Sequence, residues 1–327
     1  MRVITALACI GLVLTNIHCT ETEKTFRHYS ATDDLIKKMG RIDDSRQDTL
    51  RFWQPGVSVQ FRFEGDSCEI LVGDERLWGH NLNYIQVIVD GESVRTQLTA
   101  ANDTIRIKPE KKAPFHDVLL VKNTEANIGF MEFYGVNAKS LLPVSDETKR
   151  KFEFYGNSIT CGASSDTSAI PCGKGKWQDQ HNAWLAYGSR LGRKLKADVM
   201  LSSVSGIGLM HSCCDLDITM PMVFDKIDMR NGKLNWDFLK YQPDLVFICL
   251  GQNDGIQDSA AFVTNYRSFL NKLSSKYPGA GFILLSSPMA DDKLRAFFKS
   301  TLPSVAQDMA KIKGVYYFET SYIGGCD

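Results

Sequence analysis

The chain lacks the features that mark several large classes of proteins. Its 38 basic and 38 acidic residues cancel, so neither charge is in excess. A nucleic-acid-binding protein usually carries a basic face or a raised isoelectric point, and neither is visible, so no nucleic-acid partner is expected. No heptad pattern, low-complexity run or internal repeat stands out, which argues against coiled-coil and solenoid architectures.

The N-terminal apolar run is too short to span a bilayer. It extends over Ile4–Leu14, about ten residues, and follows the positive charge of Arg2. Cleavage after Cys19 would complete the pattern of a secretory signal peptide. We therefore expect residues 1–19 to be a signal peptide, the protein to be secreted (extracellular or periplasmic), and no membrane span. A retained interfacial anchor is the alternative.

Cysteine pairs of the C-x-x-C type are also missing, so a zinc site is not expected. Seven cysteines follow the signal segment, and an odd number leaves at least one free thiol or a missing partner. Cys249 lies in an apolar run and is expected in the core. One or two disulfides are expected among the cysteines near the predicted active-site loops, with the pairing left open: Cys161, Cys172, Cys213, Cys214 and Cys326.

Residues 25–145 have the pattern of β-structure. Apolar and polar residues alternate over 57–64, and further short apolar runs follow, separated by turn signals such as Glu64-Gly65-Asp66 and Asp90-Gly91. Many short strands without helical periodicity predict an antiparallel β-sandwich or jelly roll.

The pattern changes near Leu142-Pro143, which we interpret as the linker. Residues 150–327 alternate apolar strands with amphipathic helices, which predicts a parallel sheet with helices on both faces. The predicted strands are Phe152–Tyr155, Val199–Val204, Leu245–Leu250, Phe282–Ser286 and Val315–Phe318.

Three loops follow the first three of these strands, and active sites gather at such carboxyl ends. Ser158 offers a hydroxyl nucleophile. Gly206 lets its backbone N–H approach a ligand without a side chain in the way, and Asn253 offers a side-chain amide donor. Together they would hold the oxyanion of a tetrahedral intermediate. The competing interpretations are a helix N-cap for Ser158, a turn residue for Gly206 and a structural amide for Asn253.

The nucleophile elbow of an α/β-hydrolase does not fit this sequence. That elbow reads Gly-x-Ser-x-Gly, and here Thr160 stands in place of the second glycine. Ser158 also follows the first strand of its domain, whereas an elbow serine lies deep in the strand order.

The three loops resemble the blocks of the SGNH (GDSL-like) hydrolases. The first block, usually Gly-Asp-Ser, stands here as Gly156-Asn157-Ser158, and the second-block glycine falls on Gly206. The third block, Gly-x-Asn-Asp, stands as Gly251-Gln252-Asn253-Asp254, with Asp254 interpreted as a structural acceptor. The resemblance implies an α/β SGNH (flavodoxin-like) domain with a parallel sheet.

The combination of a β-sandwich with a Gly-Asn-Ser-Ile-Thr-Cys-Gly motif is similar to carbohydrate esterase family 2. The phrases Phe61-Arg62-Phe63-Glu64-Gly65, Val87-Ile88-Val89-Asp90-Gly91 and Leu120-Val121-Lys122 are typical of its N-terminal jelly roll. This resemblance covers nearly the whole mature chain. It implies removal of acetyl groups from polysaccharides such as xylan or glucomannan, without metal or cofactor.

The histidine base that serine hydrolysis needs is not found at its expected place. SGNH enzymes carry it in a C-terminal Asp-x-x-His block, and this chain ends at Asp327, directly before it. The resemblance makes Asp327 the acid of that block, and we expect the chain to be cut before the histidine. Substitution by another histidine, such as His181 or His211, is the alternative.

Trp177 follows a polar Gly/Lys-rich stretch and is the candidate for stacking on a sugar ring, with packing as the alternative. The leading hypothesis is a secreted polysaccharide O-acetylesterase acting on an acetylated polysaccharide or oligosaccharide. A carbohydrate-binding protein with an inactive SGNH domain is the second hypothesis. A lipid or thioester hydrolase ranks third, because no long apolar loop near Ser158 suggests an acyl-chain tunnel.

Overall fold

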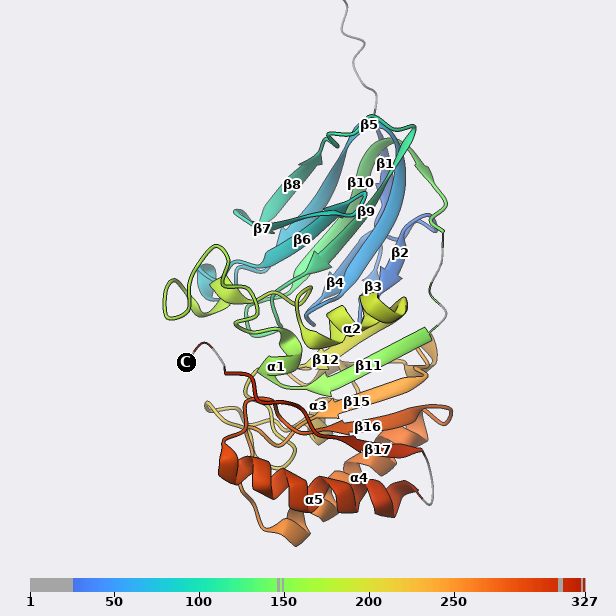
Figure 1. Cartoon of the computed structure of the whole chain (residues 1–327). Helices are drawn as coiled ribbons and strands as arrows, with labels where there is room; N and C mark the ends of the chain where they lie inside the picture. The colour runs from blue at the N-terminus through green and yellow to red at the C-terminus, as the bar shows by residue number, and fades with distance from the viewer. Residues whose placement is uncertain (1–25, 146–147, 149, 311–313, 325, 327) are drawn as a thin grey trace, which may run out of the picture.

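The computed structural model of the chain describes residues 26–145, 148, 150–310, 314–324 and 326. The predicted signal peptide over residues 1–19 lies outside the described residues. Figure 1 shows an antiparallel β domain stacked end to end on a parallel sheet with helices, and α5 runs along the far side of that sheet. The expected fold class, an antiparallel domain followed by a parallel α/β domain, is confirmed.

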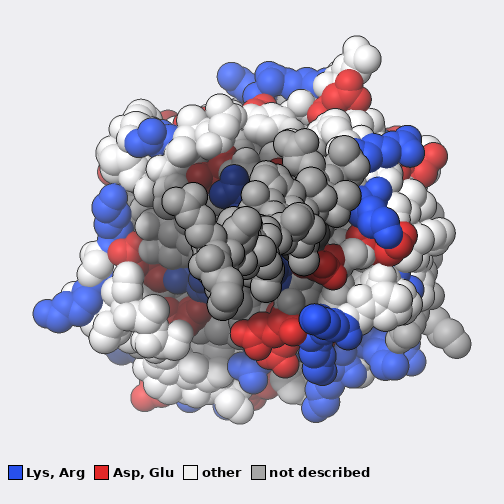
Figure 2. Space-filling view, turned by 90° about the horizontal axis from the view of Figure 1, so that it is seen from above, with Lys and Arg blue, Asp and Glu red and all other residues white. Residues whose placement is uncertain are grey.

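The N-terminal domain is one branched ten-stranded sheet with the main order β3-β4-β10-β5-β9-β6-β7. Its elements are β1 (Arg27–Ser30), β2 (Lys37–Met39), β3 (Asp43–Arg46), β4 (Thr49–Phe52), β5 (Ser58–Asp74), η1 (Leu77–Gly79), β6 (Tyr84–Val89), β7 (Glu92–Gln97), β8 (Asn102–Ile107), β9 (Phe115–Lys122) and β10 (Met131–Leu142). Figure 2 shows basic and acidic side chains scattered together around this end of the molecule, with no large patch of one sign among the described residues.

The long strand β5 connects the parts of the β domain. Its first half pairs with β9, its second half pairs with β8, and β10 runs along its other edge. The predicted turn at Glu64-Gly65-Asp66 is therefore wrong. Gly65 has a φ of +108°, and the register with β10 shifts between Ala138 and Ser140, so the glycine makes a bulge within a continuous strand.

The other predicted turn, Asp90-Gly91, is confirmed. It joins β6 to β7, and both residues have positive φ, 52° and 91°. Asn-Gly and Asp-Gly favour such two-residue hairpin loops because both positions need a left-handed backbone.

The C-terminal domain contains a five-stranded sheet of order β12-β11-β15-β16-β17, with every neighbouring pair parallel. Its elements are β11 (Arg150–Gly156), α1 (Ser158–Cys161), η2 (Trp177–Gln180), α2 (Tyr187–Leu195), β12 (Ala197–Ser203), α3 (Met220–Val223), β13 (Lys226–Asp228), β14 (Lys233–Asn235), η3 (Phe238–Lys240), β15 (Leu245–Cys249), α4 (Ser259–Lys276), β16 (Gly281–Leu285), α5 (Asp292–Ala310) and β17 (Val315–Phe318).

Helices cover both faces of the parallel sheet, as the alternation along β15 shows. Val246 and Ile248 pack in the core that contains α4 and α5. Phe247 and Cys249 belong to the core on the opposite face, against which α2 packs. The expectation that Cys249 is a core residue is confirmed, since it is buried and free of any disulfide.

A buried arginine joins the two domains. Arg41, between β2 and β3, is fully buried and reaches into the parallel-sheet domain. One Nη donates to the carbonyls of Phe224 (2.6 Å) and Lys226 (2.8 Å). The other donates to Glu153 Oε1 (2.9 Å) and to the Tyr155 hydroxyl (2.7 Å). The cation is therefore both paired and hydrogen-bonded, the condition under which a buried charge is tolerated.

We expect Arg41→Ala to lower the free energy of unfolding by about 3–5 kcal/mol, because it leaves the Glu153 carboxylate buried without its cation. Urea denaturation measures the change. The matched control is Arg106→Ala, which removes an exposed cation paired with Glu69 and should cost at most about 1 kcal/mol. Equal effects of the two substitutions would show that the buried pair contributes no more than a surface pair.

A second prediction concerns Lys122, which is fully buried and donates to the carbonyls of Thr124 (2.6 Å) and Glu125 (3.1 Å). Burial lowers its pKa from 10.5 to about 7. Between these values the unfolded chain binds more protons than the folded chain, so this lysine makes stability rise as the pH increases. Relative to Lys122→Met, the wild-type protein should therefore gain melting temperature between pH of about 7 and about 10. Parallel curves for the two proteins would contradict the prediction.

Candidate active site

The three predicted loops start from neighbouring strands of the parallel sheet. Gly156 at the end of β11 lies opposite Ser203 of β12 on one side and Cys249 of β15 on the other. The loops that carry Ser158, Gly206 and Asn253 therefore leave the sheet together, at its carboxyl edge.

Ser158 is the first residue of the short helix α1 and is half-buried. Asn157 caps this helix, since its side-chain oxygen accepts a hydrogen bond from Ile159 N at 3.1 Å. An aspartate at this position would accept the same bond, which is why asparagine can replace the commoner residue of the first block. The helix then ends at Gly162 in a left-handed conformation, so Ser158 lies within one tightly defined turn.

The side chain of Thr160 packs against Gly156 within the first block. A Cβ on Gly156 would meet Thr160 Oγ1, so only glycine fits before the cap. The Thr160 hydroxyl is in turn 2.9 Å from the hydroxyl of Tyr187, the first residue of α2. These contacts hold the backbone on which Ser158 stands.

Gly206 has a φ of +82°, a conformation that favours glycine. A Cβ at this position would approach Cys213 Sγ at 3.2 Å and Leu216 Cδ1 at 3.0 Å. Cys213 N also donates to Gly206 O at 2.9 Å, so the loop folds back on itself. Cys213 and Cys214 form a disulfide between adjacent residues within this loop.

Asp254 belongs to the third loop and binds the backbone of the second loop. Its carboxylate accepts hydrogen bonds from the backbone N–H groups of Leu209 (2.9 Å), Met210 (2.6 Å) and His211 (3.0 Å). The interpretation of Asp254 as a structural acceptor is therefore confirmed. Three amides on one carboxylate fix the distance between the Gly206 and Asn253 loops.

Asn253 points its amide at the second loop. Its Nδ2 donates to Ile207 O at 2.8 Å, next to Gly206. An amide nitrogen carries two hydrogens, so this bond leaves one N–H for another acceptor. The side chain thus supports the Gly206 loop and keeps one N–H that can donate to another acceptor.

A hollow of about 700 Å³ opens beside Ser158. Ser158 and Trp177 both line it, and Trp177 is 50% exposed while its ring packs in a T-shaped arrangement with that of His181. Gly206 and Asn253 do not belong to its lining. The other walls come from α1 and the loop after it, the start of α2, and the segments that follow β16 and β17, including Ile159, Ala163, Tyr187, Leu285, Met289, Phe318 and Ile323.

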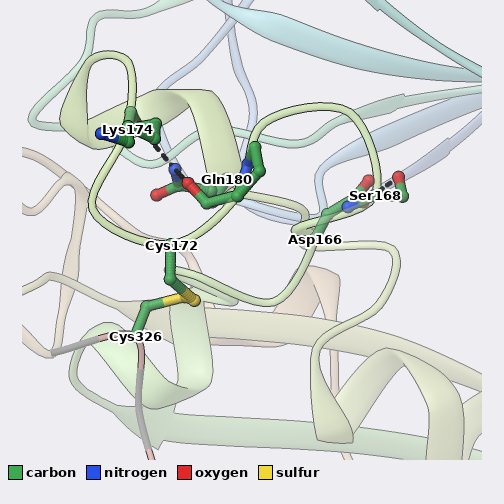
Figure 3. Close-up of a disulfide and its surroundings, with 7 residues drawn as sticks. Asp166, Ser168, Cys172, Lys174, Gln180 and Cys326 are labelled. Atoms are coloured by element: carbon green, nitrogen blue, oxygen red, sulfur yellow. Dashed lines mark hydrogen bonds between the residues drawn. A yellow bond between two sulfur atoms is a disulfide. The ribbon is translucent and has the colours of Figure 1, made fainter.

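A disulfide closes one side of this hollow. Cys172 and Cys326 are bonded and both line it, and Figure 3 shows the bridge tying the C-terminal segment to the loop before η2. Gln180 holds that loop by donating to the carbonyls of Pro171 and Lys174. With the Cys213–Cys214 bridge, two disulfides form among the five cysteines for which one or two were expected. Cys161 is buried and free.

The histidines that might replace a C-terminal base are placed differently from one another. His181 is buried, and neither ring nitrogen has a hydrogen-bond partner among the described residues. Burial lowers its pKa to about 3, so it would accept a proton poorly. His211 lies on the second loop, where its backbone N–H bonds to Asp254. Asp327, the expected acid, lies outside the described residues.

One carboxylate beneath the Ser158 and Gly206 loops was not expected from the sequence. Glu125 reaches there from the β domain and accepts a hydrogen bond from Ser205 N at 2.6 Å. Locally, Asn123-Thr124-Glu125 has the composition of a surface turn, so no sequence pattern distinguishes Glu125.

Among the described residues, no cluster of three or more His, Cys, Asp or Glu side chains is placed to hold a metal ion, and no helix is long and apolar enough to cross a membrane.

Two family models match the chain in succession. The model described as "Carbohydrate esterase 2 N-terminal" matches residues 38–144, and the model of the GDSL-like lipase/acylhydrolase family matches residues 154–320. The resemblance inferred from the three blocks and the preceding β domain is therefore confirmed.

Two curated relatives are similar over most of the chain. The cellulase/esterase CelE of Acetivibrio thermocellus is 29% identical over 265 residues, which cover 76% of this chain but only 31% of that longer protein. The acetylxylan esterase / glucomannan deacetylase of Cellvibrio japonicus is 26% identical over 307 residues, which cover 90% of this chain and 83% of that protein.

Solved structures agree. A family two carbohydrate esterase from Clostridium thermocellum in complex with cellohexaose has a TM-score of 0.80 at 26% identity, covering 88% of this chain and 89% of that chain. A family two carbohydrate esterase from Cellvibrio japonicus has a TM-score of 0.82 at 25% identity, covering 91% and 89%. With its hydrolase half matched by a family model and most of its length matched in structure, the chain belongs to the GDSL-like lipase/acylhydrolase family and carries the N-terminal domain of carbohydrate esterase family 2.

Proposed function

We propose that the protein is a serine esterase that removes O-acetyl groups from polysaccharides such as xylan or glucomannan. The curated relative that matches 90% of the chain is an acetylxylan esterase / glucomannan deacetylase. The structural neighbour with bound cellohexaose indicates that this architecture accepts a β-linked glucan chain. Both relatives support a carbohydrate ester as the substrate.

The proposed roles follow from the placement of the loops. Ser158 Oγ attacks the acetyl carbonyl carbon and passes its proton to a base, and the sugar hydroxyl leaves when the tetrahedral intermediate collapses. Gly206 N–H and the second N–H of Asn253 are proposed to stabilise the oxyanion of that intermediate. Water then hydrolyses the acetyl-serine and releases acetate. In the family's Asp-x-x-His block the aspartate orients the histidine base, and Asp327 is proposed to have that role.

Trp177 is proposed to bind the sugar. Half of its surface is exposed, and it lines the same hollow as Ser158, so a pyranose ring stacked on the indole would occupy the hollow onto which the nucleophile opens. One arrangement supports the proposed function above all others: the nucleophile opens onto a hollow with an exposed tryptophan, while amide donors stand on the adjacent loops.

Secretion is proposed on two grounds. Residues 1–19 have the signal-peptide pattern, and two disulfides are formed in the described residues. Disulfides persist in oxidising compartments, where polysaccharide substrates are also met.

In the full-length enzyme, Ser158→Ala should lower acetate release from acetylated xylan and glucomannan by about 10³-fold or more, because the nucleophile is removed. The melting temperature should not change. Ser321→Ala is the control, since Ser321 lines the same hollow but lies on none of the three loops. Residual activity within tenfold of wild type would remove Ser158 from the mechanism. Sugar binding without acetate release in the wild type would support the carbohydrate-binding hypothesis instead.

Asn253→Ala should reduce kcat by about 10²–10³-fold and change KM little, because an oxyanion donor acts mainly on the transition state. Steady-state kinetics on an acetylated oligosaccharide separate the two constants. An unchanged kcat with a raised KM would assign Asn253 to substrate binding.

A further inference from the structure

The loop between β9 and β10 inserts the β domain into the catalytic domain. Four consecutive residues of this loop, Asn123 to Ala126, are at most 1% exposed. Asn123 O accepts a hydrogen bond from Ala183 N at 3.0 Å. Ala126 O accepts one from Arg230 at 3.0 Å. The loop is thus held at both ends by groups of the other domain.

Glu125, in the middle of this loop, contacts two of the three catalytic loops. Its Oε2 accepts a hydrogen bond from Ser205 N at 2.6 Å, and Ser205 is the residue immediately before Gly206. The same oxygen is 3.5 Å from Cys161 Sγ, at the end of the helix that begins with Ser158. Cys161 Sγ is also 3.2 Å from Ser203 Oγ. One carboxylate therefore lies below both the nucleophile helix and the Gly206 loop.

The surroundings of Glu125 are unfavourable for a charge. Its other oxygen, Oε1, is buried without a hydrogen-bond partner among the described residues. Burial raises the pKa of the carboxyl group, and only the hydrogen bonds and Lys122 act against that shift. The ammonium of Lys122 bonds to the carbonyl of Glu125 and not to its carboxylate. Polar groups kept buried at such a cost are characteristic of functional sites.

We propose that Glu125 is a positioning residue for catalysis: from the β domain, it holds the Val204–Ser205 peptide, one residue before Gly206, and the nucleophile helix in the alignment that the oxyanion needs. This inference rests on the proposed function and extends it, because it makes the β domain part of the catalytic apparatus. Glu125 acts through its hydrogen bonds and does not contact the substrate.

The peptide geometry explains why this position is sensitive. Ser205 N–H and Gly206 N–H are consecutive amides, so a bond that fixes the first restrains the direction of the second. Oxyanion donors act only within a narrow range of distance, and a displacement of about 1 Å costs on the order of 10²-fold in rate. Asp254 binds the amides of residues 209–211 at the far end of the same loop, whereas the amide of Ser205 is bound by Glu125.

Three substitutions at Glu125 distinguish the effect of its side-chain length from the effect of its charge. Glu125→Gln keeps an acceptor oxygen at the same reach, so it should retain kcat within a few-fold. Glu125→Asp keeps the charge but is one methylene shorter, and Glu125→Ala removes the acceptor. Both should lower kcat by about 10–100-fold on an acetylated oligosaccharide, with KM nearly unchanged.

The matched control is Glu75→Ala. Glu75 is also a carboxylate of the β domain that bonds across the interface, to Arg230 at 3.1 Å, but it contacts none of the catalytic loops. It should lower the melting temperature and leave kcat at the wild-type value. A merely structural Glu125 would behave in the same way, so wild-type kcat in Glu125→Ala overturns the inference. A Glu125→Gln variant as slow as Glu125→Ala also overturns it, since the charge and not the acceptor would then matter.

Hydrogen exchange decides the inference even without activity. If the wild-type protein releases no acetate from any acetylated polysaccharide, the proposed function fails, but the loop can still be measured. In Glu125→Ala, amide exchange in the peptide spanning residues 203–208 should accelerate, while Glu75→Ala leaves it unchanged. Unchanged exchange of this peptide in Glu125→Ala would overturn the positioning role independently of the enzyme assay.

Discussion

The placement of the two domains depends on hydrogen bonds that the β9–β10 loop makes across their interface. Residues 123–126 of this loop are buried, so their polar groups need partners, and Ala183, Ser205 and Arg230 of the other domain supply three of them. Hydrogen bonds demand a particular distance and angle, which apolar packing alone does not. The relative position of the domains is therefore defined at the level of single bonds, next to the catalytic loops.

The buried Arg41–Glu153 pair also fixes the position of the β domain on the parallel-sheet domain. Glu153 lies on β11, the strand that leads to Ser158, and Ser202 of the neighbouring strand also donates to it, at 2.6 Å. Breaking such a pair leaves a buried charge, whereas a surface pair can separate at little cost. The β domain is thus joined both to the middle of β11, through Arg41, and to the carboxyl edge of the sheet, through Glu125.

At the carboxyl edge itself, the loops hold one another. Asp254 of the third loop binds three amides of the second, and Asn253 binds Ile207 O. Such mutual support is what a preorganised oxyanion site requires, because donors that are already oriented need no rearrangement during the reaction. The C-terminal segment closes the site through the Cys172–Cys326 bridge (Figure 3).

The sequence by itself determined the fold class, the order of the parallel strands along the chain, and the three loop motifs that resemble the SGNH blocks. These depend on local patterns: apolar runs, turn residues, and glycines where a side chain would clash, as at Gly156 and Gly206. Only the tertiary structure decided which cysteines pair, that β5 continues through Gly65, and that Arg41 and Glu125 are buried. The physical reason is that charged and loop residues resemble solvated ones locally. The groups that surround Arg41 and Glu125 belong to the other domain, and those around Arg41 lie more than a hundred positions away in the chain.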